Sequence, residues 1–342
     1  MELHPDRLFP ADEKMRAIAR QLYASVKDLP LICPHGHTDP RWFALNEQFS
    51  DATSLFVTSD PYILRLLYGH GVPLESVGVS RQDNFEATSV ASPRTAWRNF
   101  AKHYYLFQGT PSRLWLDAVF QEIFEIEYEL SVTTADFYFD HIGGKLRQEN
   151  FRPRALFQRF RIEFLATTDG ACDALNHHAE IRSSAWEGRV VPTFRPDVAL
   201  NPDDPAFLAE IVQLARLSGE NTECAAGYLN ALRSRRLVFR DAGATATDHG
   251  HATALTANLD PATFASLYEA AISNRLPSDG AALFRAHMLT EMARMSIDDG
   301  LVMQLHVGAW RGYNKGLVER YGFARGESVP QATNFVEGGV AP

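Results

Sequence analysis

The sequence predicts an α/β protein built on a parallel sheet. Strand-like runs recur along the chain with helix-like stretches between them, which is the alternation typical of parallel sheets. Ionisable or polar residues follow each run, and active sites of parallel α/β folds gather at the carboxyl ends of their strands. The five runs cover residues 31–33, 164–168, 189–194, 236–240 and 301–306.

The remaining segments are predicted to be mostly helical. Apolar residues at helical spacing predict a first helix over Glu13–Val26, which ends before Pro30. The run 31–33 then predicts a buried strand that leads into a polar loop, and residues 301–306 predict another buried strand. After residue 160, helical spacing predicts helices over 205–217, 261–273 and 280–296.

Three segments follow from this pattern. Residues 1–39 would hold the first helix and strand, and residues 40–160 would form a helical insertion, since helical spacing there is broken only by Pro and Gly. Residues 161–342 would hold the other strands with their helices.

Composition limits the partners and the compartment. Lys plus Arg total 33 against 42 Asp plus Glu, a net charge of -9, which disfavours nucleic acid and anionic membrane surfaces. The three cysteines are far apart and suggest no disulfide framework. Because the sequence shows neither a secretory signal nor an apolar run of about 18 to 20 residues, we expect a soluble, cytoplasmic protein without a membrane partner.

The pair His35-Gly36-His37 is the sharpest local motif. In an extended chain, residues two apart project to one side, so both imidazoles could share a divalent cation such as zinc. The alternative is two loop histidines with ordinary hydrogen bonds. The position directly after a predicted strand favours the metal.

Two further strand ends carry residues with open alternatives. His306 could be a third metal ligand, a group aimed at a substrate, or a core histidine. Arg195 offers a planar guanidinium suited to a carboxylate or phosphate, yet it could equally form an ion pair with Asp197. Asp169 could be a ligand, a general base or a helix cap, whereas Asp173 is better read as a helix N-cap.

Three other residues complete the candidate set. Asp248 and His249 lie in a Gly- and Thr-rich stretch with loop character. This pattern is equally compatible with side chains that face the site and with side chains that do not. Tyr62 could serve as an acid or base, although tyrosines at helical spacing more often belong to a core. Sequence motifs of Rossmann folds, P-loops and hydrolase nucleophile elbows are absent.

Seven stretches in order make the chain resemble the uronate isomerases (glucuronate isomerase) of the amidohydrolase superfamily. They run from Leu31 to about Trp310 and read LICPHGHTDPRWFA, SDPYILRLLYGHGVPLE, TPSRLWLD, FLATTD, VVPTFRPD, TDHG and MQLHVGA. The resemblance implies a metal-binding TIM barrel. It also implies reversible isomerisation of D-glucuronate to D-fructuronate, and of D-galacturonate to D-tagaturonate, by proton transfer through an enediol.

The resemblance also implies the roles of individual residues. A divalent metal, zinc or alternatively manganese, would be held by His35 and His37, and the substrate would be a small hexuronate. Tyr62 and His306 would be the catalytic residues. The substrate-binding residues would be Arg195, Asp169 and His249.

Two departures from the family shape the remaining expectations. Pro61 stands where the family has a histidine before the tyrosine, which puts a proton relay through that position in doubt.

Five predicted strands, against the eight of a full barrel, suggest a truncated member of the family, and the family's later metal-binding aspartate has no match here. An open barrel edge would favour a homo-oligomer, and turnover would be negligible. The alternatives are a metal-dependent hydrolase of the same superfamily and an inactive fragment.

Overall fold

The computed structural model describes residues 3–82 and 90–338 and divides the chain into two compact units. What we call the sheet unit comprises Leu31–Asn46, Ile162–Trp310 and Val329–Pro342. The helical unit comprises Met1–Pro30, Glu47–Arg161 and Arg311–Ser328. Each unit is described by itself.

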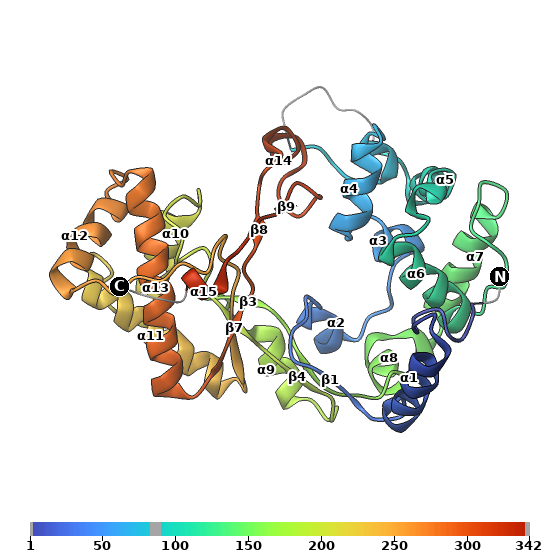
Figure 1. Ribbon diagram of the computed structural model, residues 1–342, viewed down its shortest axis with the longest axis horizontal. Helices are drawn as coiled ribbons and strands as arrows, with labels where there is room; N and C mark the ends of the chain where they lie inside the picture. Colours follow the sequence, from blue (N-terminus) through green and yellow to red (C-terminus); the bar gives the residue numbers. More distant parts are fainter. Residues whose placement is uncertain (1–2, 83–89, 339–342) are drawn as a thin grey trace. The chain divides into compact units, whose positions relative to one another are not determined.

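The sheet unit contains parallel strands that neighbour one another in chain order (Figure 1). Backbone hydrogen bonds from Thr167 N to Val191 O and from Asp169 N to Thr193 O continue the pairing between its two sheets. The predicted α/β fold with a parallel sheet is confirmed. One sheet holds β1 (Leu31–Cys33), β2 (Ile162–Ala166) and β4 (Arg189–Val191), and the other holds β3 (Asp169–Gly170), β5 (Phe194–Arg195), β6 (Ala246–His249) and β7 (Val302–Leu305).

The predicted strand over residues 236–240 is wrong, because this segment belongs to the helix α11 (Ala225–Asp241). Leu232, Arg236 and Phe239 are buried at spacings of four and three residues, which is the period of a helix face. Arg236 Nε donates to Asp299 Oδ2 at 2.6 Å, which satisfies the buried guanidinium. The strand in this part of the chain is β6, a few residues further on. Its residues ATDH contain too few apolar side chains to be recognised as a strand from the sequence.

The prediction that residues 31–33 and 301–306 form buried strands is also wrong in part. The strands exist as β1 and β7, but Ile32 and Val302 are both 65% exposed. Within the described residues, each of these strands pairs with a single neighbour, β2 or β6, and so lies at the edge of its sheet. The apolar composition of these two strands alone predicts that other elements cover both of their faces.

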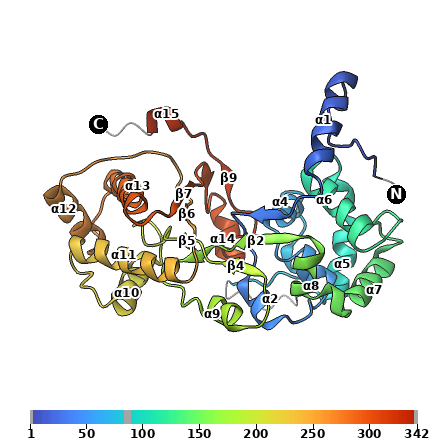
Figure 2. The ribbon, with the colours of Figure 1, turned by 90° about the horizontal axis from the view of Figure 1, so that it is seen from below.

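Helices of the sheet unit pack beside its strands. Figure 2 shows helices of this unit grouped next to β5, β6 and β7. Phe194, Phe284 and Met288 are fully buried in the core of the unit. The helices predicted over 205–217, 261–273 and 280–296 are present. The helices are α2 (Pro40–Leu45), α9 (Asn176–Ser183), α10 (Phe207–Ser218), α11, α12 (Pro261–Ile272), α13 (Ser278–Asp299) and α15 (Phe335–Gly338); the short antiparallel pair is β8 (Ala309–Trp310) with β9 (Val329–Pro330).

The helical unit packs around buried aromatic residues such as Trp97, whose indole N–H donates to Ala135 O. Its segment 311–328 is tied in by the hydrogen bond from Tyr321 to Glu75. The helices are α1 (Glu13–Val26), α3 (Ala52–Phe56), α4 (Pro61–Gly69), α5 (Pro93–Lys102), α6 (Pro111–Ala118), α7 (Ala135–Leu146), α8 (Pro153–Arg159) and α14 (Lys315–Tyr321), with the shorter turns η1 (Leu74–Val77), η2 (Tyr104–Phe107), η3 (Val119–Ile123) and η4 (Glu149–Phe151).

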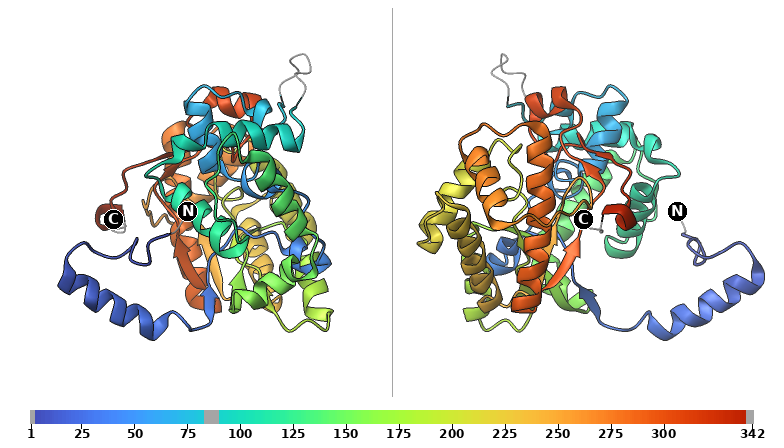
Figure 3. Two further views of the ribbon diagram at one scale, coloured as in Figure 1. Left: turned by 90° about the vertical axis from the view of Figure 1, so that its right-hand side faces the viewer. Right: turned by 60° about the vertical axis from the view of Figure 1, so that its left-hand side comes forward.

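Two features of these helices bear on the sequence predictions. The first helix covers Glu13–Val26 as predicted, but it buries no residue and stands clear of the other helices of its own unit in Figure 3. The described elements between residues 40 and 160 are all helical, and residues 83–89 of that segment lie outside the described residues. The three segment boundaries stay a prediction. A helix long and apolar enough to cross a membrane is not found among the described residues.

Removal of the Phe194 ring should destabilise the sheet unit strongly. Phe194 is fully buried and packs edge to face on Phe239 with ring centroids 5.1 Å apart. We expect Phe194→Ala to lower the free energy of unfolding by about 3 to 5 kcal/mol in chemical denaturation. Val212→Ala, at a side chain that is 53% exposed, is the control and should change it by less than about 0.5 kcal/mol. Equal losses in both variants would contradict this assignment of the core.

Candidate functional site

The HGH motif lies in the loop after β1 and brings two imidazoles together. The Nε2 atoms of His35 and His37 are 3.2 Å apart. Two histidine nitrogens bound to one tetrahedral zinc at about 2.0 to 2.1 Å would lie roughly 3.3 to 3.4 Å apart. The pair therefore has the spacing that a shared divalent cation requires.

Gly36 holds this loop against the second strand. A Cβ at this position would lie 3.0 Å from Ala166 O, and the Thr168 hydroxyl donates to Gly36 O at 2.7 Å. A larger residue at position 36 would push the loop, with its two histidines, away from β2. The glycine is thus required by close packing as well as by the motif.

Gln304 selects the tautomer of His35, and sequence analysis missed this residue. Its Nε2 donates to Pro34 O at 3.0 Å, which leaves Oε1 to accept from His35 Nδ1 at 3.2 Å. His35 then carries its proton on Nδ1 and, when neutral, turns the lone pair of Nε2 toward His37. Burial lowers the pKa of His37, which favours its neutral form as well. Strand alternation could have found Gln304, since it lies two residues before His306.

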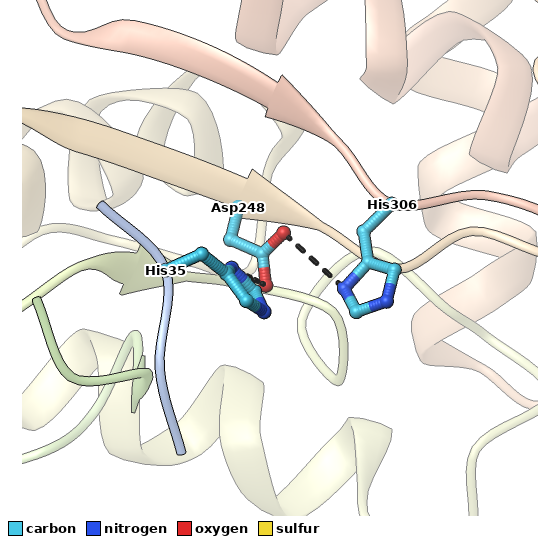
Figure 4. Close-up of side chains that lie close together, drawn as sticks. All are labelled: His35, Asp248 and His306. Carbon is cyan, nitrogen blue, oxygen red and sulfur yellow. Dashed lines mark ion pairs between the residues drawn. The ribbon is translucent and has the colours of Figure 1, made fainter. Parts of the chain in front are cut away.

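Asp248 is the buried acid at the centre of the site (Figure 4). It extends from β6 and is 0% exposed, with Oδ2 3.2 Å from Arg195 Nη1 and 3.8 Å from His35 Nδ1. Oδ1 lies 3.7 Å from His306 Nδ1. Among the described residues neither oxygen finds a properly aligned hydrogen-bond donor, a costly state for a buried carboxylate. The positive charge around it must therefore stabilise it.

Ligand atoms of His35, Asp248 and His306 all lie within 4.8 Å of one another. This group could hold a metal, and the His35 atom that lies 3.8 Å from Asp248 Oδ2 is Nδ1, the nitrogen that also faces Gln304 Oε1. His35 therefore offers a cation either of two nitrogens, Nδ1 toward Asp248 or Nε2 toward His37.

Arg195 is held in place on two sides. Its Nε donates to Asp197 Oδ2 at 2.7 Å, and Asp197 Oδ1 accepts from Gly250 N at 2.8 Å. Burial alone would raise the pKa of Asp197, but the Arg195 guanidinium and the Gly250 N–H hold it below its usual value. Among the described residues Nη2 of Arg195 has no partner. The ion pair with Asp197 therefore exists and still leaves one donor for a ligand.

Asp169 is a buried carboxyl in the same unit. Its Oδ2 accepts from Thr167 Oγ1 at 2.7 Å and from Thr193 N at 3.2 Å, and burial raises its pKa to about 6. It caps no helix. The predicted cap at Asp173 is wrong: the N-cap of α9 is Leu175, and Asp173 Oδ1 instead accepts from Leu175 N in the preceding turn.

The other two predicted residues lie elsewhere. His249 projects to the opposite face of β6 from Asp248, where its Nε2 lies 3.0 Å from Thr247 Oγ1 and burial lowers its pKa to about 3. Tyr62 belongs to the helical unit, where it is 66% exposed near the start of α4 and lines a cavity of about 430 Å³ with Arg65. The roles of both residues stay predictions.

Asp169 should make stability depend on pH. A folded-state pKa near 6, above the ordinary value of about 3.9, means that its contribution is fully present below about pH 4 and is lost as the pH rises through 6. We therefore expect Asp169→Asn to gain stability relative to the unmodified protein between pH 4.5 and pH 7.5. Chemical denaturation at both pH values measures the difference, and a difference that does not change with pH would contradict the assignment.

Comparisons with known proteins show the family of the chain. The family model described as glucuronate isomerase matches residues 12–337. A uronate isomerase of Rhizorhabdus wittichii is 52% identical over 98% of this chain and 70% of its own length. The crystal structure of glucuronate isomerase from Caulobacter crescentus matches with a TM-score of 0.94 and 47% identity, covering 98% of this chain and 70% of the other. A uronate isomerase structure from Thermotoga maritima gives a TM-score of 0.88 at 28% identity, covering 99% and 72%. The chain therefore belongs to the glucuronate isomerase family, whose members are uronate isomerases.

Proposed function

We propose that the chain catalyses the reversible isomerisation of D-glucuronate to D-fructuronate, and of D-galacturonate to D-tagaturonate. The observation that carries this proposal is the close placement of an imidazole pair, a buried carboxylate and a guanidinium that follow or end strands of the sheet unit. The parallel strands of the sheet unit would be part of a TIM-type barrel, the fold that places its active site at this end of the strands. A homo-oligomer and a cytoplasmic location belong to the same proposal.

His35 and His37 would hold a divalent metal through their Nε2 atoms. The 3.2 Å spacing and the Nδ1 proton of His35 support this choice, and the buried charge of Asp248 would add to the attraction for a cation. Zinc suits imidazole ligands, with manganese as the alternative. When bound, such an ion would act as a Lewis acid toward a substrate oxygen.

Arg195 would bind the substrate carboxylate. Its Nε is occupied by Asp197 and its Nη1 faces Asp248, so Nη2 is the donor that can turn to a ligand. Because Asp197 and Asp248 hold the guanidinium in one orientation, less conformational entropy is lost when a ligand binds. The uronate would thus be oriented by its acid group while chemistry proceeds at the other end.

Tyr62 and His306 would move the protons. Isomerisation removes a proton from C2 of the aldose and returns one to C1, while a hydroxyl proton passes between the two oxygens of the enediol. One group must therefore act as a base and another as an acid. The imidazole of His306 is half exposed beside Asp248, so it could reach a substrate. Asp169 and His249 would be further substrate-binding residues.

The activity test is formation of ketose from D-glucuronate, followed by proton NMR in the presence of zinc or manganese. We expect turnover, in place of the negligible turnover that the strand count suggests, because the chain belongs to the glucuronate isomerase family. A chelator should abolish this turnover and added metal should restore it. Arg195→Met should lower kcat/KM by about 100-fold or more, because a buried charged hydrogen bond to the carboxylate is lost.

Arg216→Met is the matched control, since it removes an exposed arginine on α10 and should leave kcat/KM unchanged. Absence of ketose with either metal would overturn the proposed function. Equal effects of the two arginine variants would overturn the role of Arg195.

A further inference from the structure

A second cavity adjoins the HGH loop on the side of His37. It has a volume of about 370 Å³, within the range of ligand pockets of roughly 300 to 1,000 Å³. Its walls come from the loop after β1, the segment around β3 and the start of α9. Carboxylates of Asp39, Asp169 and Asp173 line it together with His37. The cavity therefore opens directly beside one of the two candidate metal ligands.

Asp169 is the best-anchored carboxylate in this cavity. The residue is 5% exposed, and the hydrogen bonds that described residues make to its carboxylate both go to Oδ2. They come from the hydroxyl of Thr167 and the backbone N–H of Thr193. Oδ1 is left as the acceptor for a group inside the cavity.

Thr167 and His178 fix the direction of that carboxylate. The Thr167 hydroxyl donates its proton to Asp169, so it accepts from His178 Nε2, which lies 2.8 Å away. Both side chains are buried; His178 also lines the cavity, whereas Thr167 does not and acts on it through Asp169. They are positioning residues for the carboxylate.

The charges of the site would sort the two ends of a uronate. Three carboxylates in the cavity repel the acid group of the substrate but accept hydrogen bonds from hydroxyls. Arg195, whose guanidinium suits the acid group, does not line the cavity. The hydroxylated carbon chain therefore suits the cavity, and the carboxylate suits the guanidinium.

From this geometry we propose that the cavity beside His37 is the subsite for the hydroxylated chain of the uronate, with Asp169 as its hydroxyl acceptor. The proposal rests on the proposed function and deepens it, because it assigns the end of the substrate that each part of the site recognises.

The test is equilibrium binding of D-gluconate, a polyhydroxy acid that has no aldehyde to isomerise, measured by calorimetry on the zinc-loaded protein. Asp169→Asn should weaken binding about tenfold or more, since a hydrogen bond to a charged group is replaced by a neutral one. Unchanged affinity in Asp169→Asn, or no binding of D-gluconate by the unmodified protein, would overturn the subsite.

A matched pair of variants separates positioning from general loss of a buried hydroxyl. Thr167→Val removes the hydroxyl that holds Asp169, whereas Thr193→Val removes a buried hydroxyl that has no partner among the described residues and keeps the backbone N–H. We expect weaker D-gluconate binding only in Thr167→Val, with affinity recovered in Thr167→Ser. Equal affinity of the two valine variants would overturn the positioning role.

The outcome is separable from that of the proposed function. If the unmodified protein binds D-gluconate but forms no ketose from D-glucuronate, the proposed function fails, while the comparison with Asp169→Asn still decides the subsite. If ketose forms and Asp169→Asn binds D-gluconate as tightly as before, only the subsite fails.

Discussion

The buried carboxylate of Asp248 is the constraint on which the site depends. It is fully enclosed and has no hydrogen bond from the described residues, so its charge must be balanced by positive or polarisable neighbours. Arg195 supplies that balance from one side, and the rings of His35 and His306 approach from the others. Because these groups come from four strand ends, the parallel sheet and the site specify each other.

His35 links this acid to the imidazole pair. Its Nδ1 faces Gln304 and Asp248, while its Nε2 faces His37. The amide of Gln304 leaves one consistent proton position, and that position presents a lone pair to the neighbouring histidine. A supporting residue behind a ligand thus decides which nitrogen is available, which is how outer groups commonly tune metal sites.

Local patterns predicted the parallel α/β fold, the HGH pair and the family, because these depend on alternation and short motifs. They failed where tertiary context decides. Residues 236–240 contain a short apolar run like that of a strand but form part of a helix, since burial there follows helical spacing. Asp248 lies in a stretch with loop character in the sequence, and its burial depends on the pairing of that stretch, as β6, with β5 and β7. Gln304 was missed because its role lies in a contact with Pro34, 270 positions away in the chain.

The most direct test of this account is the free energy of unfolding at increasing zinc concentration, for the unmodified protein and for Asp248→Asn. Zinc should stabilise the unmodified protein by about 1.4 kcal/mol for each tenfold rise above the dissociation constant. The variant, which lacks the buried charge, should need much more zinc for the same gain and should be no less stable without metal. Identical zinc dependence in both proteins would contradict the claim that Asp248 organises the site around a cation.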